Sequence, residues 1–180
     1  MNMTSTNENI VKRFGKYSLF IGIMLIIIGT TGILLPALMS LETVVFIASF
    51  MLVGGVFWAL HTYKYSKKSV MDWLKPLVLI LTGGLMFFMP SVGIATVGLM
   101  LSFYLMMDAF GSFTLAQSLH PDKGWGWMAL NGVFSIILAV LFLIGWPQTS
   151  LWLVGLYVAI SLIFDGWALV FIGWNIKKTS

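Results

Sequence analysis

Two acidic residues interrupt long apolar segments of this chain, where an unpaired charge is costly. Asp108 lies 18 residues after Pro90, and Asp165 lies 18 residues after Pro147. A carboxylate at the centre of a membrane-spanning helix costs roughly 2.5 to 3.5 kcal/mol on insertion scales. Each acid therefore needs a proton, a hydrogen-bonding partner or water.

Hydroxyl groups lie one helical turn from both acids. Tyr104 and Ser112 flank Asp108, and Ser161 precedes Asp165 by four residues. Side chains four residues apart share a face of a helix, so these hydroxyls could hydrogen-bond the carboxyl groups in either protonation state. The five residues form the candidate site of the sequence. Two roles are open for the acids: they link neighbouring helices, or they titrate or contact a substrate.

The composition places these acids in a membrane protein. Hydrophobic residues make up 59% of the 180 residues and charged residues only 9%, with a mean hydropathy of +0.99. A soluble domain is usually about one quarter charged. The chain cannot cover itself with polar surface, so the solvent of its helices is lipid.

Six apolar runs follow one another along the chain and predict six transmembrane helices. Residues 1–16 are expected to form a cytoplasmic N-terminal tail, disordered over 1–11, and residues 175–180 a cytoplasmic C-terminal tail. Basic residues before the first run resemble a signal peptide, but the run is long enough to span and no small-residue cleavage site closes it. The runs cover residues 17–35, 43–62, 76–89, 93–117, 127–144 and 151–174.

The basic residues predict the orientation of the chain. All 10 Lys and Arg residues lie in the two tails or in the second and fourth connections. The other three connections contain none. The positive-inside rule therefore places both termini in the cytoplasm. With the outer turn ending near Ile94, Asp108 lies fourteen residues deeper, roughly 21 Å into a hydrocarbon layer of about 30 Å, in its inner leaflet.

The prolines divide the membrane domain, residues 17–174, into three repeats. Pro36, Pro90 and Pro147 are 54 and 57 residues apart and mark the turn of each repeat. Each repeat is predicted to be a helical hairpin, and the three are parallel repeats covering about 17–63, 73–119 and 127–174. Gly54 replaces the acid in the first repeat, which disfavours a symmetric ring of carboxylates.

Several classes of function lack their residues. The sequence has no cysteine and only two histidines, which makes a metal centre improbable, and no cofactor is expected. We find no HExxH, GxSxG or phosphate-loop motif, so the chain is not expected to be an enzyme. The basic residues occur in short clusters between apolar runs, so nucleic acid is not an expected partner. The expected partners are membrane lipids and a second copy of the chain in a homo-oligomer.

The repeat architecture resembles that of a known family. Three proline-centred hairpins, the segments GTTGILLP and TGGLMFFMP, and the late Asp-Gly at Asp165 resemble the HdeD-type acid-resistance proteins. This resemblance covers residues 16–176. It implies a multi-pass protein of the bacterial inner membrane that contributes to survival in acid, and it carries over no catalytic residue.

Two functions remain open from the sequence. The first is a structural or stress-protective membrane protein. Glu42 is the sole ionisable residue expected on the outer side, so that face would change little in acid. The second is a small proton- or cation-coupled transporter or channel that uses Asp108 and Asp165.

Overall fold

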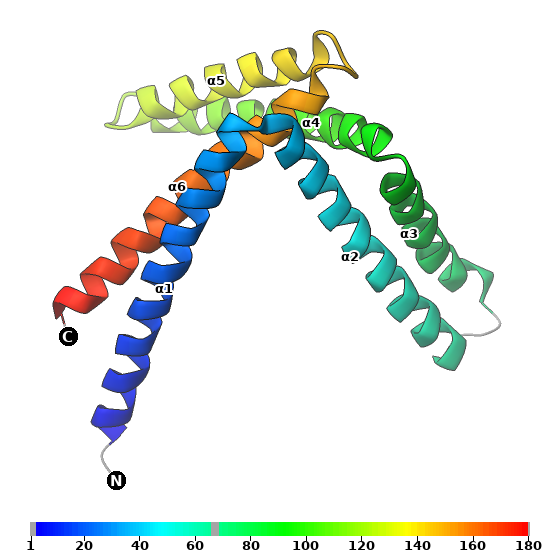
Figure 1. The fold of residues 1–180 in the computed structure, drawn as a ribbon. Helices are drawn as coiled ribbons and strands as arrows, with labels where there is room; N and C mark the ends of the chain where they lie inside the picture. The colour runs from blue at the N-terminus through cyan, green and yellow to red at the C-terminus, as the bar shows by residue number, and fades with distance from the viewer. Residues whose placement is uncertain (1–2, 66–68, 180) are drawn as a thin grey trace. The chain divides into compact units, whose positions relative to one another are not determined.

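Six α-helices form the described part of the chain. The computed structural model describes residues 3–65 and 69–179, and within these ranges there is no β-strand. All six helices are long and apolar enough to cross a membrane, by length and composition. This confirms the predicted all-α class and the six spans. The helices are α1 (Met3–Leu34), α2 (Pro36–Tyr65), α3 (Val70–Phe88), α4 (Pro90–Leu119), α5 (Trp125–Leu143) and α6 (Ser150–Thr179) (Figure 1).

The first helix begins earlier than the sequence predicts. α1 starts at Met3, so the expectation of a disordered tail over 1–11 is wrong from that residue onward, and residues 1–2 lie outside the described part. Extending a formed helix requires no new nucleation, and Met, Glu, Lys and Arg are good helix formers. The polar segment therefore continues the helix that the apolar run begins. α6 likewise continues through the predicted tail as far as Thr179.

The three repeat prolines lie at the starts of helices or directly before them. Pro36 and Pro90 are the first residues of α2 and α4, and Pro147 lies in the turn before α6. The first N–H groups of a helix have no partner within it, so a proline loses no hydrogen bond there. The sharp stops between apolar runs thus follow from proline chemistry.

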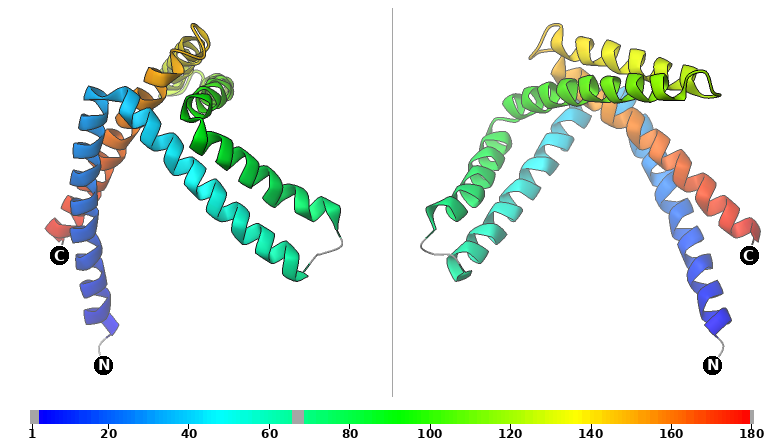
Figure 2. Two further views of the ribbon diagram at one scale, coloured as in Figure 1. Left: turned by 45° about the vertical axis from the view of Figure 1, so that its right-hand side comes forward. Right: turned by 180° about the vertical axis from the view of Figure 1, so that it is seen from behind.

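The helices group into two units, each described here by itself. One unit contains the chain up to Met39 together with the chain from Gly155 onward, and the other contains residues 40–154. In the first unit α1 runs antiparallel to α6. In the second unit α2 runs beside α3, and α4 beside α5 (Figures 1 and 2).

Glycines bring the backbones of α1 and α6 into direct contact. A Cβ atom added at Gly22 would lie 2.7 Å from the carbonyl oxygen of Gly166, and one added at Gly166 would lie 2.7 Å from that of Gly22. Lipid tails are as apolar as leucine, so helices associate in a bilayer largely where small residues allow close approach. This contact is the reason for the glycines in both spans.

A proline inside α3 creates a second kind of contact. Pro76 has no N–H group, so the carbonyl oxygen of Asp72 one turn earlier loses its helical donor. The buried Thr62 hydroxyl of α2 donates to this carbonyl at 3.3 Å. The α2·α3 pair is thereby joined at the point where the helix cannot satisfy itself.

The α1·α6 and α2·α3 pairs use the same register when residues are counted from the prolines. Gly29 lies seven residues before its proline and contacts the carbonyl oxygen of Ala159, twelve residues after another. Gly83 and Ala48 occupy the same two positions and make the same contact. The repeat seen in the sequence is therefore also a repeat of helix contacts.

The α4·α5 pair meets one residue away from this register, through a hydrogen bond. Ser102, twelve residues after its proline, donates at 3.1 Å to the carbonyl oxygen of Ala139, which lies eight residues before Pro147. Packing between α4 and α5 is far more extensive than packing between α3 and α4. The closely packed pairs thus connect one predicted hairpin to the next, rather than the two helices on either side of a proline.

Helices within the second unit also meet near their first residues. A Cβ atom added at Gly93 of α4 would lie 2.6 Å from Val44 of α2, and one added at Gly98 would overlap the Ser150 side chain. In the first contact Gly93 lies three positions after Pro90, and Val44 lies eight after Pro36. In the second, Ser150 lies three positions after Pro147, and Gly98 lies eight after Pro90. The Ser150 hydroxyl is buried and has no hydrogen-bond partner among the residues that the structure describes.

We expect Gly166→Ala to destabilise the protein, because the new methyl group meets backbone that cannot move aside. Alanine favours a helix by about 1 kcal/mol over glycine, so the loss will appear against an intrinsic gain. Gly111→Ala is the matched control, since an added Cβ there has no neighbour within 4 Å. Thermal unfolding in detergent, followed by circular dichroism, measures both. A midpoint for Gly166→Ala equal to or above that of Gly111→Ala would contradict the contact.

Candidate functional site

The carboxyl group of Asp108 is held by the neighbouring helix. The Ser135 hydroxyl of α5 donates to Asp108 Oδ2 at 2.6 Å, and the Asn131 amide donates to the same oxygen at 3.2 Å. Asp108 is half-buried and Ser135 is buried. Two donors match the acceptor capacity of one carboxylate oxygen, which has two lone pairs. The acid therefore links α4 to α5.

Asn131 connects the acid to one of the predicted hydroxyls. Its amide nitrogen also donates to Ser112 Oγ at 2.8 Å. Ser112 is buried on α4, one turn after Asp108. These four residues, Asp108, Ser112, Asn131 and Ser135, are called the α4–α5 polar cluster below.

Neither hydroxyl expected beside Asp108 bonds it directly within the described residues. Ser112 reaches the acid through Asn131, and Tyr104 is exposed on α4. The donors that bond Asp108 come instead from the facing helix α5.

Asp165 lies in a different environment. It is exposed on α6 and makes no hydrogen bond or ion pair with the part of the chain that the structure describes. Ser161 is half-buried one turn earlier and does not donate to it within the described residues. The structure thus brings together the residues around Asp108 and leaves the residues around Asp165 apart.

Gly54 occupies the corresponding position of the first repeat. A Cβ atom added there would have no neighbour within 4 Å. Space is therefore not the reason for the missing acid on α2. The second and third repeats carry an acid at this position, Asp108 and Asp165. Only Asp108 has hydrogen-bond partners among the described residues.

Asn131 and Ser135 are the functional residues that sequence reasoning missed as partners. They lie four residues apart, on the face of α5 that also carries Gly132 and Ala139. An amide and a hydroxyl on the small-residue face of a membrane helix are the signal for an interhelical hydrogen bond. The identity of the facing helix was the part that the sequence did not contain.

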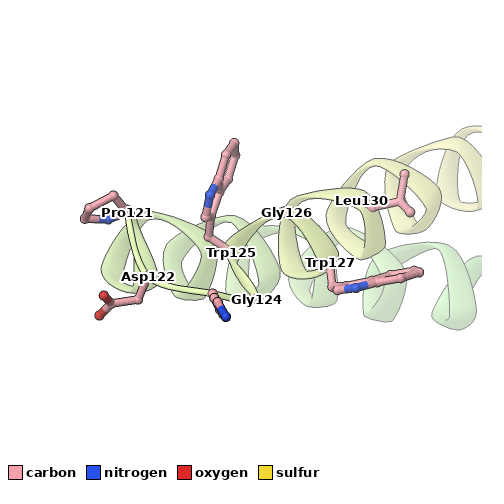
Figure 3. Close-up of a pocket in the computed structure, with 8 residues that line it drawn as sticks. Pro121, Asp122, Gly124, Trp125, Gly126, Trp127 and Leu130 are labelled. Carbon is pink, nitrogen blue, oxygen red and sulfur yellow. The ribbon is translucent and has the colours of Figure 1, made fainter.

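The α4–α5 connection has a surface depression without convergent chemistry. Pro121, Asp122, Trp125 and Trp127 line it, and their side chains point in different directions (Figure 3). Among residues 3–65 and 69–179 no group of three or more His, Asp or Glu side chains could hold a metal ion. The α4–α5 polar cluster therefore remains the best-defined candidate site.

Comparison with known proteins gives a family for the chain. The family described as a short repeat of unknown function (DUF308) matches residues 20–80 and again residues 76–144. The two matches begin 56 residues apart, close to the proline spacings of 54 and 57. No curated protein and no solved structure matches the chain.

The fold and the repeat together define a multi-pass α-helical membrane protein built from an internal repeat. The family matches span residues 20–144, more than half of the chain. The chain belongs to the DUF308 family.

We expect Asp108 and Ser135 to be energetically coupled. A double-mutant cycle with Asp108→Ala and Ser135→Ala should give a coupling of about 0.6 to 1.7 kcal/mol, the range measured for hydrogen bonds between membrane helices. Reversible unfolding in mixed micelles provides the four free energies of unfolding. The control cycle pairs Asp165→Ala with Ser135→Ala and should give no coupling. Equal coupling in both cycles would mean that Asp108 does not bind Ser135 in the membrane-like environment.

Proposed function

We propose that this protein is a bacterial inner-membrane protein, with both termini in the cytoplasm, that contributes to survival under acid stress. Its role in this proposal is structural and protective rather than catalytic. HdeD-type acid-resistance proteins belong to the same family, and the sequence resembles them over residues 16–176. Membership of this family supports the role in acid survival, and the α4–α5 polar cluster supports a structural role.

The observation that carries the structural role is the α4–α5 polar cluster. The carboxyl group of Asp108 receives two hydrogen bonds from α5, so it is engaged in helix association. Breaking a polar network in an apolar setting leaves its members unsatisfied, which is more costly than never having placed them there. Such a link supports a protein whose task is to keep its fold.

The predicted outer connections agree with a protein that meets acid from outside. The turns that contain Pro36, Pro90 and Pro147 carry no Lys, Arg or His, and Glu42 at the start of α2 is exposed. Acid can add positive charge only to groups that bind a proton. An outer face with one carboxylate gains little charge and little self-repulsion as the pH falls.

We expect the protein to raise acid survival in a bacterium that lacks its own members of this family. Cells expressing the wild-type chain should survive an acid challenge several-fold better than cells with an empty vector. Asp108→Asn should reduce the benefit, because the link between α4 and α5 weakens, whereas Asp122→Asn in the exposed connection should not. Equal survival with and without the protein, at verified membrane expression, would contradict the proposal.

A second candidate function is a small proton- or cation-coupled transporter or channel that uses Asp108 and Asp165. One observation favours it: Asp165 is exposed on a membrane-spanning helix and has no partner among the described residues. Acidic residues within membrane segments commonly mark ion or proton pathways.

Flux measurements separate the two functions. If the protein transports protons or cations, proteoliposomes under a pH gradient will show flux that Asp108→Asn and Asp165→Asn abolish. If it is structural, flux will equal that of empty liposomes for protons and for monovalent cations. A dye enclosed in the vesicles reports the first, and ion-selective electrodes report the second.

A further inference from the structure

The α2·α3 pair carries a row of aromatic rings at the end next to its connection. Trp58, His61 and Tyr65 follow one another at spacings of three and four residues, so they share one face of α2. The ring centroids of Trp58 and His61 are 5.6 Å apart, and those of His61 and Tyr65 are 4.8 Å apart. Tryptophan and tyrosine are enriched where a helix leaves the membrane, so these three residues, called the α2 aromatic row below, mark the headgroup level.

Two lysine ammonium groups lie over rings of the α2 aromatic row. Lys75 of α3 places its Nζ atom 3.7 Å from the centroid of the Trp58 ring, and Lys64 places its Nζ atom 5.4 Å from that of Tyr65. A cation within about 6 Å of a ring centroid is attracted by the negative face of the ring. The contact between Lys75 and Trp58 joins the two helices and fixes the position of a long, charged side chain.

Lys75 has no counter-ion among the described residues. Asp72 lies three residues earlier on α3, but the two side chains form no ion pair. The backbone N–H of Asp72 donates to the Ser69 hydroxyl at 3.4 Å, in the first helical turn, where the helix N-terminus stabilises a carboxylate. The Trp58 ring attracts the charge of Lys75 but does not neutralise it. The N–H donors of the ammonium group therefore call for an anion.

The level of this ammonium group in the membrane indicates which anion it meets. Trp58 lies four residues before the end of the second apolar run at residue 62, roughly 6 Å inside the hydrocarbon layer. Lys75 directly precedes the third apolar run. A lysine at such a place keeps its methylene stem in apolar surroundings and extends its charged end toward the headgroups. The phosphate groups of phospholipids are the abundant anions at that level.

The surrounding charge favours an anionic headgroup over a zwitterionic one. Residues 63–75 contain four lysines and one acid, and Lys64 lies just beyond the second apolar run. A zwitterionic headgroup carries its own cation beside the phosphate, and lysines repel that cation. Basic residues next to a membrane-spanning helix are attracted to anionic lipids.

We propose that Lys75, positioned by Trp58, binds the phosphate of an anionic phospholipid in the leaflet next to the α2–α3 connection. The ring holds the ammonium group in place, and the phosphate supplies the missing counter-ion. This lipid site requires neither the acid-survival role nor transport.

Native mass spectrometry of the full chain in detergent tests the proposed lipid. The chain is mixed with equal amounts of phosphatidylglycerol and phosphatidylcholine that have the same acyl chains, and the bound lipids are counted. The wild-type chain should retain phosphatidylglycerol in preference. Lys75→Gln should lower this preference about fivefold, as expected for one basic residue near an anionic surface. Lys123→Gln, in the α4–α5 connection, is the matched control and should leave the preference unchanged.

Conservative variants separate lipid binding from folding defects. Lys75→Arg keeps the charge and its attraction to the Trp58 ring, so it should keep the preference for phosphatidylglycerol. Trp58→Phe keeps an aromatic face and should retain more of the preference than Trp58→Leu. Glycerol 3-phosphate is added in a separate arm, and it should not displace the lipid because it has no acyl chains.

The proposal is overturned if Lys75→Gln leaves the preference unchanged, if Lys123→Gln lowers it equally, or if Lys75→Arg behaves like Lys75→Gln. A preference in Trp58→Leu equal to that of the wild type would contradict the positioning role of Trp58. Displacement of the lipid by glycerol 3-phosphate would show a site for a soluble phosphate and would overturn the assignment to a phospholipid.

Discussion

Close backbone contact at small residues is the constraint on which this structure depends. The hydrophobic effect offers no net driving force between helices that are already in lipid, so association requires packing and hydrogen bonds. The pairs α1·α6 and α2·α3 provide packing through glycine at one fixed register, with Gly29 on Ala159 and Gly83 on Ala48. The α4·α5 pair is shifted by one residue from that register and is joined there by a hydrogen bond from Ser102. The repeat therefore varies its contact chemistry together with a small change of register.

The polar residues differ among the three pairs. The α2·α3 pair places a threonine where Pro76 has freed a carbonyl oxygen, and the α4·α5 pair bonds an acid to an amide and a hydroxyl, with a second hydroxyl bonded to that amide. The α1·α6 pair relies on glycine and aliphatic surface. The first two pairs thus satisfy polar groups within the protein, as lipid requires.

The sequence was sufficient for the class, the six spans and the repeat, because each follows from local patterns. Apolar runs determine spans, and prolines without N–H groups determine where helices begin. Helix pairing was not available in this way. The spacing of Gly15, Gly22 and Gly29 predicts a contact face but not the helix that it contacts, and Asp108 gave no sign that its donors lie on α5. The prediction of a disordered N-terminal tail failed because it rested on composition alone. It took no account of the adjoining helix, which extends into this polar segment.

The pairing of α1 with α6 has a consequence for how the protein is made. A ribosome delivers α1 to the membrane before α6, so α1 must wait for its partner helix while the four helices between them are made. The α2·α3 and α4·α5 pairs join neighbours in the chain and can form as soon as their second helix arrives. The α1·α6 contact thus forms after the other two pairs can form, and a chain truncated before Gly166 would leave the glycine face of α1 open to lipid.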